Sequence, residues 1–480
     1  MAKISDLSDE LLVKILSFLP TKVAVSTSVL SKQWMFIWMW LPKLEFGFSR
    51  RSKYACLRDF IDKNLPLHKA PIIESLYLDS FFGSLQPEDM KSWVGIAVSR
   101  YVRELSIDYS SLYDRSVALL PCSLYRCKSL VTLKLIGEKI LVDVPPTVCL
   151  PSLKTLRLDY VTYSKDESLR LLLSYCPVLE DLFIDSDYYP KLVNIPENVS
   201  CSLYSWKSLV TLKLQGEKIL VNVPPTVCLP SLKTLQLLCV TYLNEESLGL
   251  LLSCCALLED LSIERDCNDN VKALVVVVPS LQRLTLTIEQ GCSADGYVIV
   301  TPSLKYFYLV DKRSESSCLI EHMHMPELEE ADISLMEDIE KDIEMLFKSI
   351  TTVKRLSLNM SFNGGKETVH RDGIVFSQLE DLKLYIRSDN WSKLLVHLLK
   401  HSPNLQILNL LLDDLFNGGY RNYEPVGWSN NQSSVPECFL NSLETFKFNG
   451  YNSREAEDRD FLSFIFKHAR CLKSTSIVHV

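Results

Sequence analysis

The sequence predicts an α/β repeat protein in which short parallel strands stack along one axis. One observation is a duplication: the 42 residues CSLYRCKSLVTLKLIGEKILVDVPPTVCLPSLKTLRLDYVTY, from Cys122, recur with few changes 79 residues later at Cys201. Another is a shorter pattern close to Leu-x-x-Leu-x-Leu, whose copies mostly begin 23 to 30 residues apart. The third is length, because 480 residues exceed one compact core but suit an array that grows unit by unit.

Each repeat is expected to add one strand to the concave face of an irregular solenoid over residues 47–425. In TLKL (132–135) the leucines lie two residues apart and point to one face, while the threonine and lysine point to the other. One short strand cannot bury its leucines alone, so successive units must stack in parallel. Helices and loops are expected outside, because KDESLRLLLSYCPVLE (165–180) has helical spacing whereas VPPTVCLP excludes a regular helix.

Residues 1–46 follow a different pattern, which predicts three short helices. Ser8 can cap the first helix, Thr21 can begin the second and Ser31 can cap the third. The first helix ends before Pro20, and its apolar face comprises Leu11, Leu12, Ile15, Leu16 and Leu19. The third helix lies in LSKQWMFIWMWLP (30–42), where one stripe is formed by Trp34, Ile37, Trp38 and Leu41.

The third helix is apolar on every side, because Met35, Phe36, Met39 and Trp40 lie outside its main stripe. Three short helices cannot cover such a helix alone, so a partner is expected to cover the rest. Part of the surplus is expected to pack on the first repeat; if all four side chains are exposed, they belong to the partner surface instead. The alternative is a helical cap on the first repeat, but a cap needs only one apolar face.

Residues 426–480 predict a strand–helix–strand unit that closes the open end of the stack. SLETFKF and CLKSTSI flank a helix with an acidic start and a basic end, REAEDRDFLSFIFKHAR. Phe461, Phe464, Ile465 and His468 share one face of that helix. His468 is therefore expected in the core or at its rim, not as a ligand.

No catalytic residue, cofactor site or metal site is expected, because the motifs of metalloproteases, serine hydrolases, dinucleotide-binding proteins and P-loop proteins are missing from the sequence. Cys318, His322 and His324 lie close together but have no identifiable fourth metal ligand. The acidic run 327–344 fits a solvated repeat face. Lys134, Arg157, Lys213 and Arg283 alternate with acidic residues, so no anion pocket is expected.

The composition argues against several partners and compartments. The net charge of −8, without a long Lys/Arg run, argues against nucleic acid. No apolar stretch reaches the ~20 residues that a membrane span needs, and the N-terminus does not resemble a signal peptide. Fifteen cysteines without a secretion signal indicate free thiols in a reducing compartment, the cytoplasm or the nucleus.

Each of the three regions resembles a known module. Residues 1–46 are similar to the F-box, which docks onto a Skp1-type adaptor; the matching residues are Leu7, Asp9 to Leu12, Ile15, Leu16, Leu19, Pro20, TSVLSKQW (27–34) and Trp38. Ser8 and Gln33 stand where that family usually has Pro and Arg. The repeats resemble leucine-rich repeats. Residues 426–480 resemble the FBD domain at Val435 to Cys438, Ser442 to Phe446, Gly450, Tyr451 and Ala469 to Lys473.

The resemblance implies a plant protein of the F-box/leucine-rich-repeat/FBD family, a substrate-recognition subunit of an SCF-type E3 ubiquitin ligase. The adaptor, and through it a cullin–RING ligase, would bind the F-box, while other subunits transfer ubiquitin. The implied adaptor-binding residues are Leu7, Leu11, Leu12, Ile15, Leu16, Leu19, Pro20, Leu30, Trp34 and Trp38. Two alternatives remain open: a receptor that senses a small ligand on its repeat face, and a repeat scaffold outside any ligase.

A substrate protein is expected on the outward-pointing strand residues of the repeats. Arg283, Tyr306 and Tyr308 are candidates there, because arginine and aromatic side chains make good interface anchors. The alternative for each is an ordinary solvated strand face. The identity of the substrate does not follow from the sequence.

Overall fold

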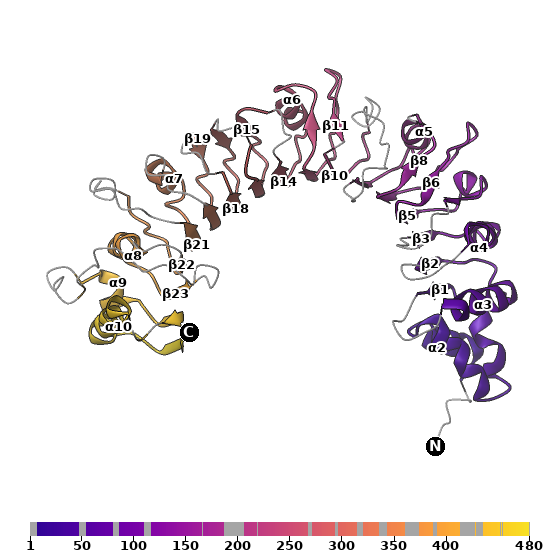
Figure 1. The fold of residues 1–480 in the computed structure, drawn as a ribbon, viewed down its shortest axis with the longest axis horizontal. Helices are drawn as coiled ribbons and strands as arrows, with labels where there is room; N and C mark the ends of the chain where they lie inside the picture. The colour runs from indigo at the N-terminus through magenta and orange to yellow at the C-terminus, as the bar shows by residue number, and fades with distance from the viewer. Residues whose placement is uncertain are drawn as a thin grey trace. The chain divides into compact units, whose positions relative to one another are not determined.

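The structure is a computed structural model. It describes residues 7–47, 54–79, 86–109, 117–165, 167–186, 206–217, 219–266, 271–292, 296–313, 320–335, 343–360, 374–386, 391–412, 428, 435–451, 453 and 455–479. The chain divides into two compact units, residues 1–232 and 233–480, and strands run through both (Figure 1). No helix in the described ranges is long and apolar enough to cross a membrane.

The first unit begins with helices and continues as strands separated by helices and loops. Its elements are α1 (Asp9–Leu16), α2 (Thr21–Ser26), η2 (Thr27–Val29), η3 (Trp34–Trp40), β1 (Lys43–Phe46), α3 (Tyr54–Asn64), η4 (Leu65–Leu67), β2 (Ser75–Asp79), α4 (Pro87–Ser99), β3 (Glu104–Asp108), β4 (Ala118–Leu119), η5 (Leu124–Arg126), β5 (Thr132–Ile136), β6 (Ile140–Val142), β7 (Thr155–Asp159), β8 (Thr162–Tyr163), α5 (Ser168–Ser174), β9 (Asp181–Asp185), β10 (Thr211–Gln215) and β11 (Leu220–Val221).

The predicted parallel stack of leucine-rich strands is confirmed. In the first unit β1, β2, β3, β5, β7, β9 and β10 pair in that order, all parallel. The register places equivalent leucines side by side, as in Leu105, Leu133 and Leu156, and all three are fully buried. Each leucine thus packs against its copies in the neighbouring repeats, which is how short strands acquire a continuous core.

Helices cover these strands where the sequence permits them. The capping box of α4 uses the side chains of Gln86 and Asp89, and Pro87 occupies the first turn, where its missing N–H has no cost. The predicted helix after residue 165 is α5, which buries Leu169, Leu172 and Leu173. The proline-rich VPPTVCLP segments contain neither helix nor strand, as predicted.

The second unit repeats this organisation. Its elements are β12 (Thr234–Leu238), β13 (Thr241–Tyr242), α6 (Ser247–Ser253), β14 (Asp260–Arg265), β15 (Leu274–Val277), β16 (Arg283–Ile288), β17 (Tyr297–Val300), β18 (Tyr306–Asp311), β19 (Ile320–His324), β20 (Glu330–Leu335), α7 (Ile343–Ser349), β21 (Arg355–Met360), β22 (Asp381–Ile386), α8 (Trp391–Lys400), β23 (Ile407–Leu412), α9 (Glu437–Asn441), β24 (Thr445–Tyr451), α10 (Ala456–His468) and β25 (Ser474–His479).

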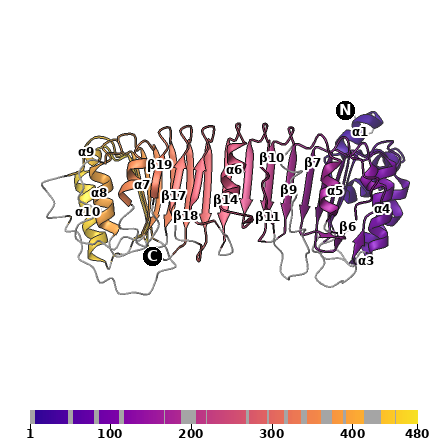
Figure 2. The same ribbon diagram turned by 90° about the horizontal axis from the view of Figure 1, so that it is seen from above.

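Two parallel sheets run along this unit. Strands β12, β14, β16, β18, β20, β21, β22, β23, β24 and β25 pair successively in the main sheet. Figure 2 shows part of this row, with β14 and β18 labelled. A smaller sheet joins β15, β17 and β19. His322 and His324 lie exposed on β19, whereas Cys318 lies outside the described residues. Within the described ranges no three His, Cys, Asp or Glu residues gather closely enough to hold a metal ion.

The C-terminal end of the second unit has an aromatic core. The strand–helix–strand predicted there is β24, α10 and β25, and β24 pairs with β25. Phe461 and Ile465 of α10 are fully buried. His468 is half-buried, with its ring centroid 4.7 Å from that of Phe464, so it lies at the rim of the core.

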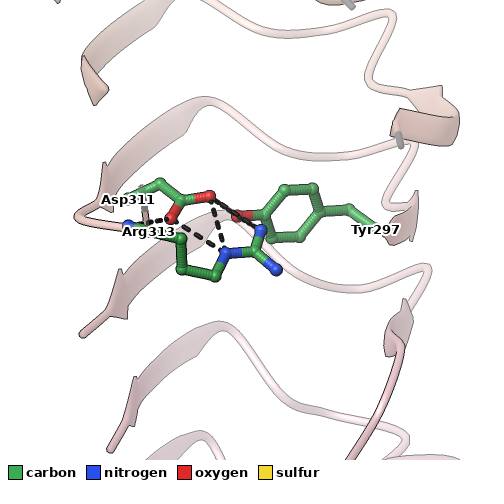
Figure 3. Close-up of polar contacts among 3 residues, drawn as sticks. All are labelled: Tyr297, Asp311 and Arg313. Atoms are coloured by element: carbon green, nitrogen blue, oxygen red, sulfur yellow. Dashed lines mark hydrogen bonds and ion pairs between the residues drawn. The ribbon is translucent and has the colours of Figure 1, made fainter. Parts of the chain in front are cut away.

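A charged cluster is buried where β18 ends. Asp311 is the last residue of β18, and Arg313 follows it with 6% of its surface exposed. The Arg313 guanidinium donates to the Asp311 carboxylate through Nε (3.0 Å) and Nη2 (2.8 Å), and Tyr297 of β17 donates its hydroxyl to the same carboxylate. Arg313 also donates to the Tyr297 hydroxyl (2.6 Å), so the three side chains close a ring of hydrogen bonds (Figure 3).

Candidate functional site

The N-terminal module has a small core of its own. Leu12 and Leu16 of α1 are fully buried, and the stripe predicted for the third helix, Trp34, Ile37, Trp38 and Leu41, is buried as well. That helix is the 3₁₀ helix η3, which is tighter than an α-helix. Ser8 occupies the N-cap of α1 but makes no side-chain cap bond.

Gln33 joins two helices at the edge of this core. The amide Nε2 of Gln33 donates to the carbonyl oxygen of Leu7 and to Oδ1 of Asp9, both at 3.2 Å. Gln33 therefore links the start of η3 to the start of α1. A neutral amide can make this link without the charge of the arginine that is common at this position.

An apolar surface remains exposed around the module. Of the residues predicted to contact an adaptor, Leu11, Ile15, Leu19, Pro20 and Leu30 are exposed, with Leu30 at 64%, and Leu7 is half-buried. Leu12, Leu16, Trp34 and Trp38 are buried inside the module, so they support this surface and do not form it. We call the exposed residues Leu11, Ile15, Phe18, Leu19, Val23, Val29 and Leu30 the apolar face.

Three members of the apolar face were not predicted as site residues. Phe18 is 81% exposed, Val29 is 88% exposed, and Val23 is also exposed. Spacing could have identified Phe18, because it follows Ile15 by three residues and Leu11 by seven and so extends a second stripe along α1. Val29 lies in η2, a segment too short for any periodicity to show which side faces solvent.

The four apolar residues outside the main stripe of the third helix differ in their exposure to solvent. Met39 is buried, and its carbonyl oxygen accepts hydrogen bonds from the backbone N–H groups of Lys69 (2.7 Å) and Ala70 (3.2 Å), just after η4. Met35, Phe36 and Trp40 stay exposed, and the Lys69 ammonium lies 5.8 Å from the centre of the Phe36 ring. Met39 thus joins the first repeat through its backbone, and the packing of its side chain on that repeat stays a prediction.

Buried polar groups connect the module to the first strands. The hydroxyl Oγ1 of Thr21, at the start of α2, accepts a hydrogen bond from the N–H of Glu45 in β1 (2.7 Å). His68 is buried and its Nε2 donates to the carbonyl oxygen of Leu41 (2.7 Å). Burial lowers the pKa of His68, and the nearby Arg100 lowers it further, although the bond to Leu41 opposes both. His68 therefore acts as a neutral structural donor.

The Thr21 bond should hold the orientation between module and sheet. Thr21→Val removes the acceptor and leaves the Glu45 N–H without its partner, which should cost about 1–3 kcal/mol. We expect faster hydrogen exchange at β1 in this variant, measured by mass spectrometry. Ser26→Ala is the control, because the Ser26 hydroxyl donates to the carbonyl oxygen of Val23 in its own helix, at an exposed site. Equal exchange in the two variants would contradict the role given to Thr21.

The predicted substrate-binding residues lie together on the polar face of the second unit's sheet. Arg283 of β16 is in register with Tyr306 of β18, and Tyr308 stands two residues further along the same strand. Arg283 is exposed and its Nε lies 3.2 Å from Oδ1 of Asp260, while both tyrosines are half-buried.

Several basic residues along the strands are paired with acidic neighbours. Nε of Arg157 lies 2.5 Å from Oδ2 of Asp159. Residues that immediately precede a strand are paired as well. Lys154 lies 2.6 Å from Glu180, and in the second unit Lys233 lies 2.8 Å from Glu259. Of the basic residues named from the sequence, Arg157 and Arg283 are thus each paired with an aspartate.

Comparisons with known proteins agree with this architecture. Residues 4–46 match the F-box domain model, residues 90–214 and 191–363 match the model for the LRR repeats of FBD-associated F-box protein At5g56370, and residues 430–477 match the FBD model. Stacked leucine-rich strands preceded by this helical module define a leucine-rich-repeat protein of the F-box class.

Full-length relatives identify the family. The chain is 57% identical to the putative FBD-associated F-box protein At5g56700 of Arabidopsis thaliana, over 100% of this chain and 98% of that protein. It is 48% identical to the FBD-associated F-box protein At5g60610 and 51% identical to the putative FBD-associated F-box protein At5g56690, both from Arabidopsis thaliana and both matched over their whole length. The chain belongs to the plant F-box/LRR/FBD protein family.

Proposed function

We propose that this protein is the substrate-recognition subunit of an SCF-type ubiquitin ligase. Its F-box would dock onto a Skp1-type adaptor, and through the adaptor onto a cullin–RING ligase, while the repeats hold a substrate protein. The chain would act as a tether that raises the local concentration of substrate near the ubiquitin carrier. Ubiquitin transfer would belong to other subunits.

The observation that carries this proposal is the apolar face. Leu12, Leu16, Trp34 and Trp38 already fill the core of the module, so the side chains of the apolar face are not needed to fold it. Large exposed apolar patches on soluble proteins mark interaction sites. The same part of the chain matches the F-box domain model. A Skp1-type adaptor is therefore the partner that best fits the apolar face.

Charge placed on the apolar face should abolish adaptor capture while leaving the fold intact. We expect Val29→Asp combined with Leu30→Asp to weaken co-purification of a Skp1-type adaptor at least about 100-fold, because an interface core does not tolerate unpaired carboxylates. The two side chains are 88% and 64% exposed, so the module's own packing is spared.

Leu257→Asp is the matched control, because Leu257 is 53% exposed on the turn before β14, outside the F-box. It should bind adaptor like the wild type. Wild-type capture no stronger than that of the double variant would refute the ligase proposal and favour a repeat scaffold without an adaptor.

We also propose that the protein works in a reducing compartment, the cytosol or the nucleus. Cys176, Cys255 and Cys438 are buried free thiols. Burial raises the pKa of the Cys176 and Cys255 thiols to about 12, which keeps them protonated and unreactive. Imaging of a fluorescent fusion of the full chain tests this location, and a signal outside the cell or in the secretory pathway would contradict it.

A further inference from the structure

Two tyrosines and two carboxylates adjoin on the polar face of the second unit's sheet. Tyr306 and Tyr308 lie on β18, and the register sets Glu330 and Asp332 of β20 directly beside them. Paired strands are about 4.8 Å apart, so side chains at matched positions on one face touch or nearly touch. The rings and the carboxylates therefore form one small surface.

Two arginines flank this surface, and neither is paired with Asp332. Both flanking arginines already have carboxylate partners: Nε of Arg283 lies 3.2 Å from Asp260, and Nη2 of Arg355 lies 2.6 Å from Glu330. Asp332 makes neither an ion pair nor a hydrogen bond within the described ranges, although it is half-buried. A carboxylate in this position lacks a cation.

The neighbours of Asp332 do not supply that cation. On β21 the residue in register is Ser357, whose Oγ is buried without a hydrogen-bond partner in the described part of the chain. On the other side stands the ring of Tyr308. Burial raises the pKa of Tyr306, and the charges of Asp332 and Glu330 raise it further against the effect of Arg283, so negative charge lies close to the Tyr306 ring.

We propose that Tyr306, Tyr308 and Asp332 form a subsite for a lysine or arginine side chain of the substrate protein. The ring faces attract a cation through their negative quadrupole, and the carboxylate accepts a charge-assisted hydrogen bond from it. The inference rests on the proposed function, because it names the chemistry that the repeat face would recognise. Arg283 then stays paired with Asp260 at the edge of this surface and does not contact an acidic group of the substrate.

Other occupants fit this surface less well. An acidic side chain would meet two carboxylates and could reach a cation only by breaking the pair of Arg283 or of Arg355. An apolar side chain would desolvate Asp332 without compensation, which is costly for a charged group. A basic side chain compensates the carboxylate and also covers the rings.

Selection of peptides on the full-length chain tests this subsite. Phage-displayed random 12-residue peptides are first depleted on the Tyr308→Ala variant and then selected on the wild type. We expect the recovered peptides to share one lysine or arginine position and to bind the Asp332→Asn variant about tenfold more weakly. Selection on Asp332→Lys should replace that position by aspartate or glutamate.

Two variants control for general effects. Tyr308→Phe keeps the ring and should bind the selected peptides normally, and so should Asp460→Asn, which neutralises an exposed aspartate on α10. Recovered peptides without a shared basic position, peptides that bind Asp332→Asn as well as wild type, or no peptides after depletion would each overturn the subsite. Adaptor capture, measured on the same variants, depends on the F-box, so failure of the ligase proposal would be seen separately.

Discussion

Replacing Arg313 by methionine should destabilise β16, β18 and β20 by about 3–5 kcal/mol. The substitution keeps most of the side-chain volume but removes the cation that neutralises Asp311, and Asp311 is only 2% exposed. A buried carboxylate without its partner is costly because water cannot reach it. Native-state hydrogen exchange of these strands measures the loss as a lower free energy of local opening.

Two further variants separate the buried pair from general damage. Lys312→Met removes the neighbouring cation, whose Nζ lies 2.6 Å from Oε1 of Glu289, but that pair is partly exposed and should cost less than about 1 kcal/mol. Asp311→Leu combined with Arg313→Met removes both charges and should regain much of the stability. If Arg313→Met costs no more than Lys312→Met, the buried pair does not hold this part of the sheet.

The pH dependence of stability gives an independent signature of the same pair. Burial alone would raise the pKa of Asp311, but the hydrogen bonds and charge of Arg313, with the hydroxyl of Tyr297, outweigh burial and lower it. In the wild type this stabilisation is present above the ordinary carboxyl pKa of about 3.9 and is lost only as the pH falls through the lowered value.

In Arg313→Met the shift of the Asp311 pKa should have the opposite sign. Burial remains while the cation is gone, so the pKa of Asp311 should rise above about 3.9. A protein that contains a carboxyl group with a raised pKa becomes less stable as the pH increases. The variant should therefore be less stable at pH 8 than at pH 5, relative to the wild type. Urea unfolding at both pH values measures the free energy of unfolding of the variant and of the wild type. If this free energy changes equally with pH in the two proteins, Arg313 does not have the assigned role.

The repeats could be predicted from sequence because their information is local and recurrent. Leu133 and its copies recur at a fixed position in each unit, and parallel stacking is the arrangement that buries them all. The helix at α5 and the loops at VPPTVCLP followed from spacing and from proline chemistry. Stretches such as SLVTLKL therefore determine both the strand and its register.

The cluster at Asp311 could not be predicted, because its members are brought together by the fold. Tyr297 belongs to β17 of the smaller sheet, whereas Asp311 ends a strand of the main sheet. The alternation in YFYLVD marks Asp311 as a core-facing position but does not reveal its partner. An acid at a core position was the available signal, since such a residue needs a cation or several donors.

At the candidate site, sequence identified the right helices but not the direction of each side chain. Trp34 and Trp38 are as apolar as Leu30 and Val29, yet the tryptophans are buried in the module and the other two face solvent. Periodicity identified Trp34 and Trp38 as one stripe, but it could not show that this stripe faces the module's own core, and η2 has only three residues, too few to show which side faces solvent. Residues that support the apolar face and residues that form it therefore look alike in the sequence.

Trp34→Ala should unfold the N-terminal module, whereas Trp40→Ala should not. Trp34 is 5% exposed, so its removal leaves a cavity and should cost about 3–5 kcal/mol, which a module of three short helices cannot tolerate. Trp40 lies on the same helix with 49% of its surface exposed, and it makes the matched control with a cost below about 1 kcal/mol. Hydrogen exchange over residues 7–47 measures both.

Adaptor capture then distinguishes support from contact. Trp34→Ala should lose adaptor together with exchange protection, whereas Val29→Asp with Leu30→Asp should lose adaptor while protection stays intact. Because a support residue acts only through the fold, excess adaptor should restore part of the protection of Trp34→Ala by binding the folded form. If Trp34→Ala loses adaptor with its protection unchanged, Trp34 contacts the partner, and the module must open around that side chain on binding.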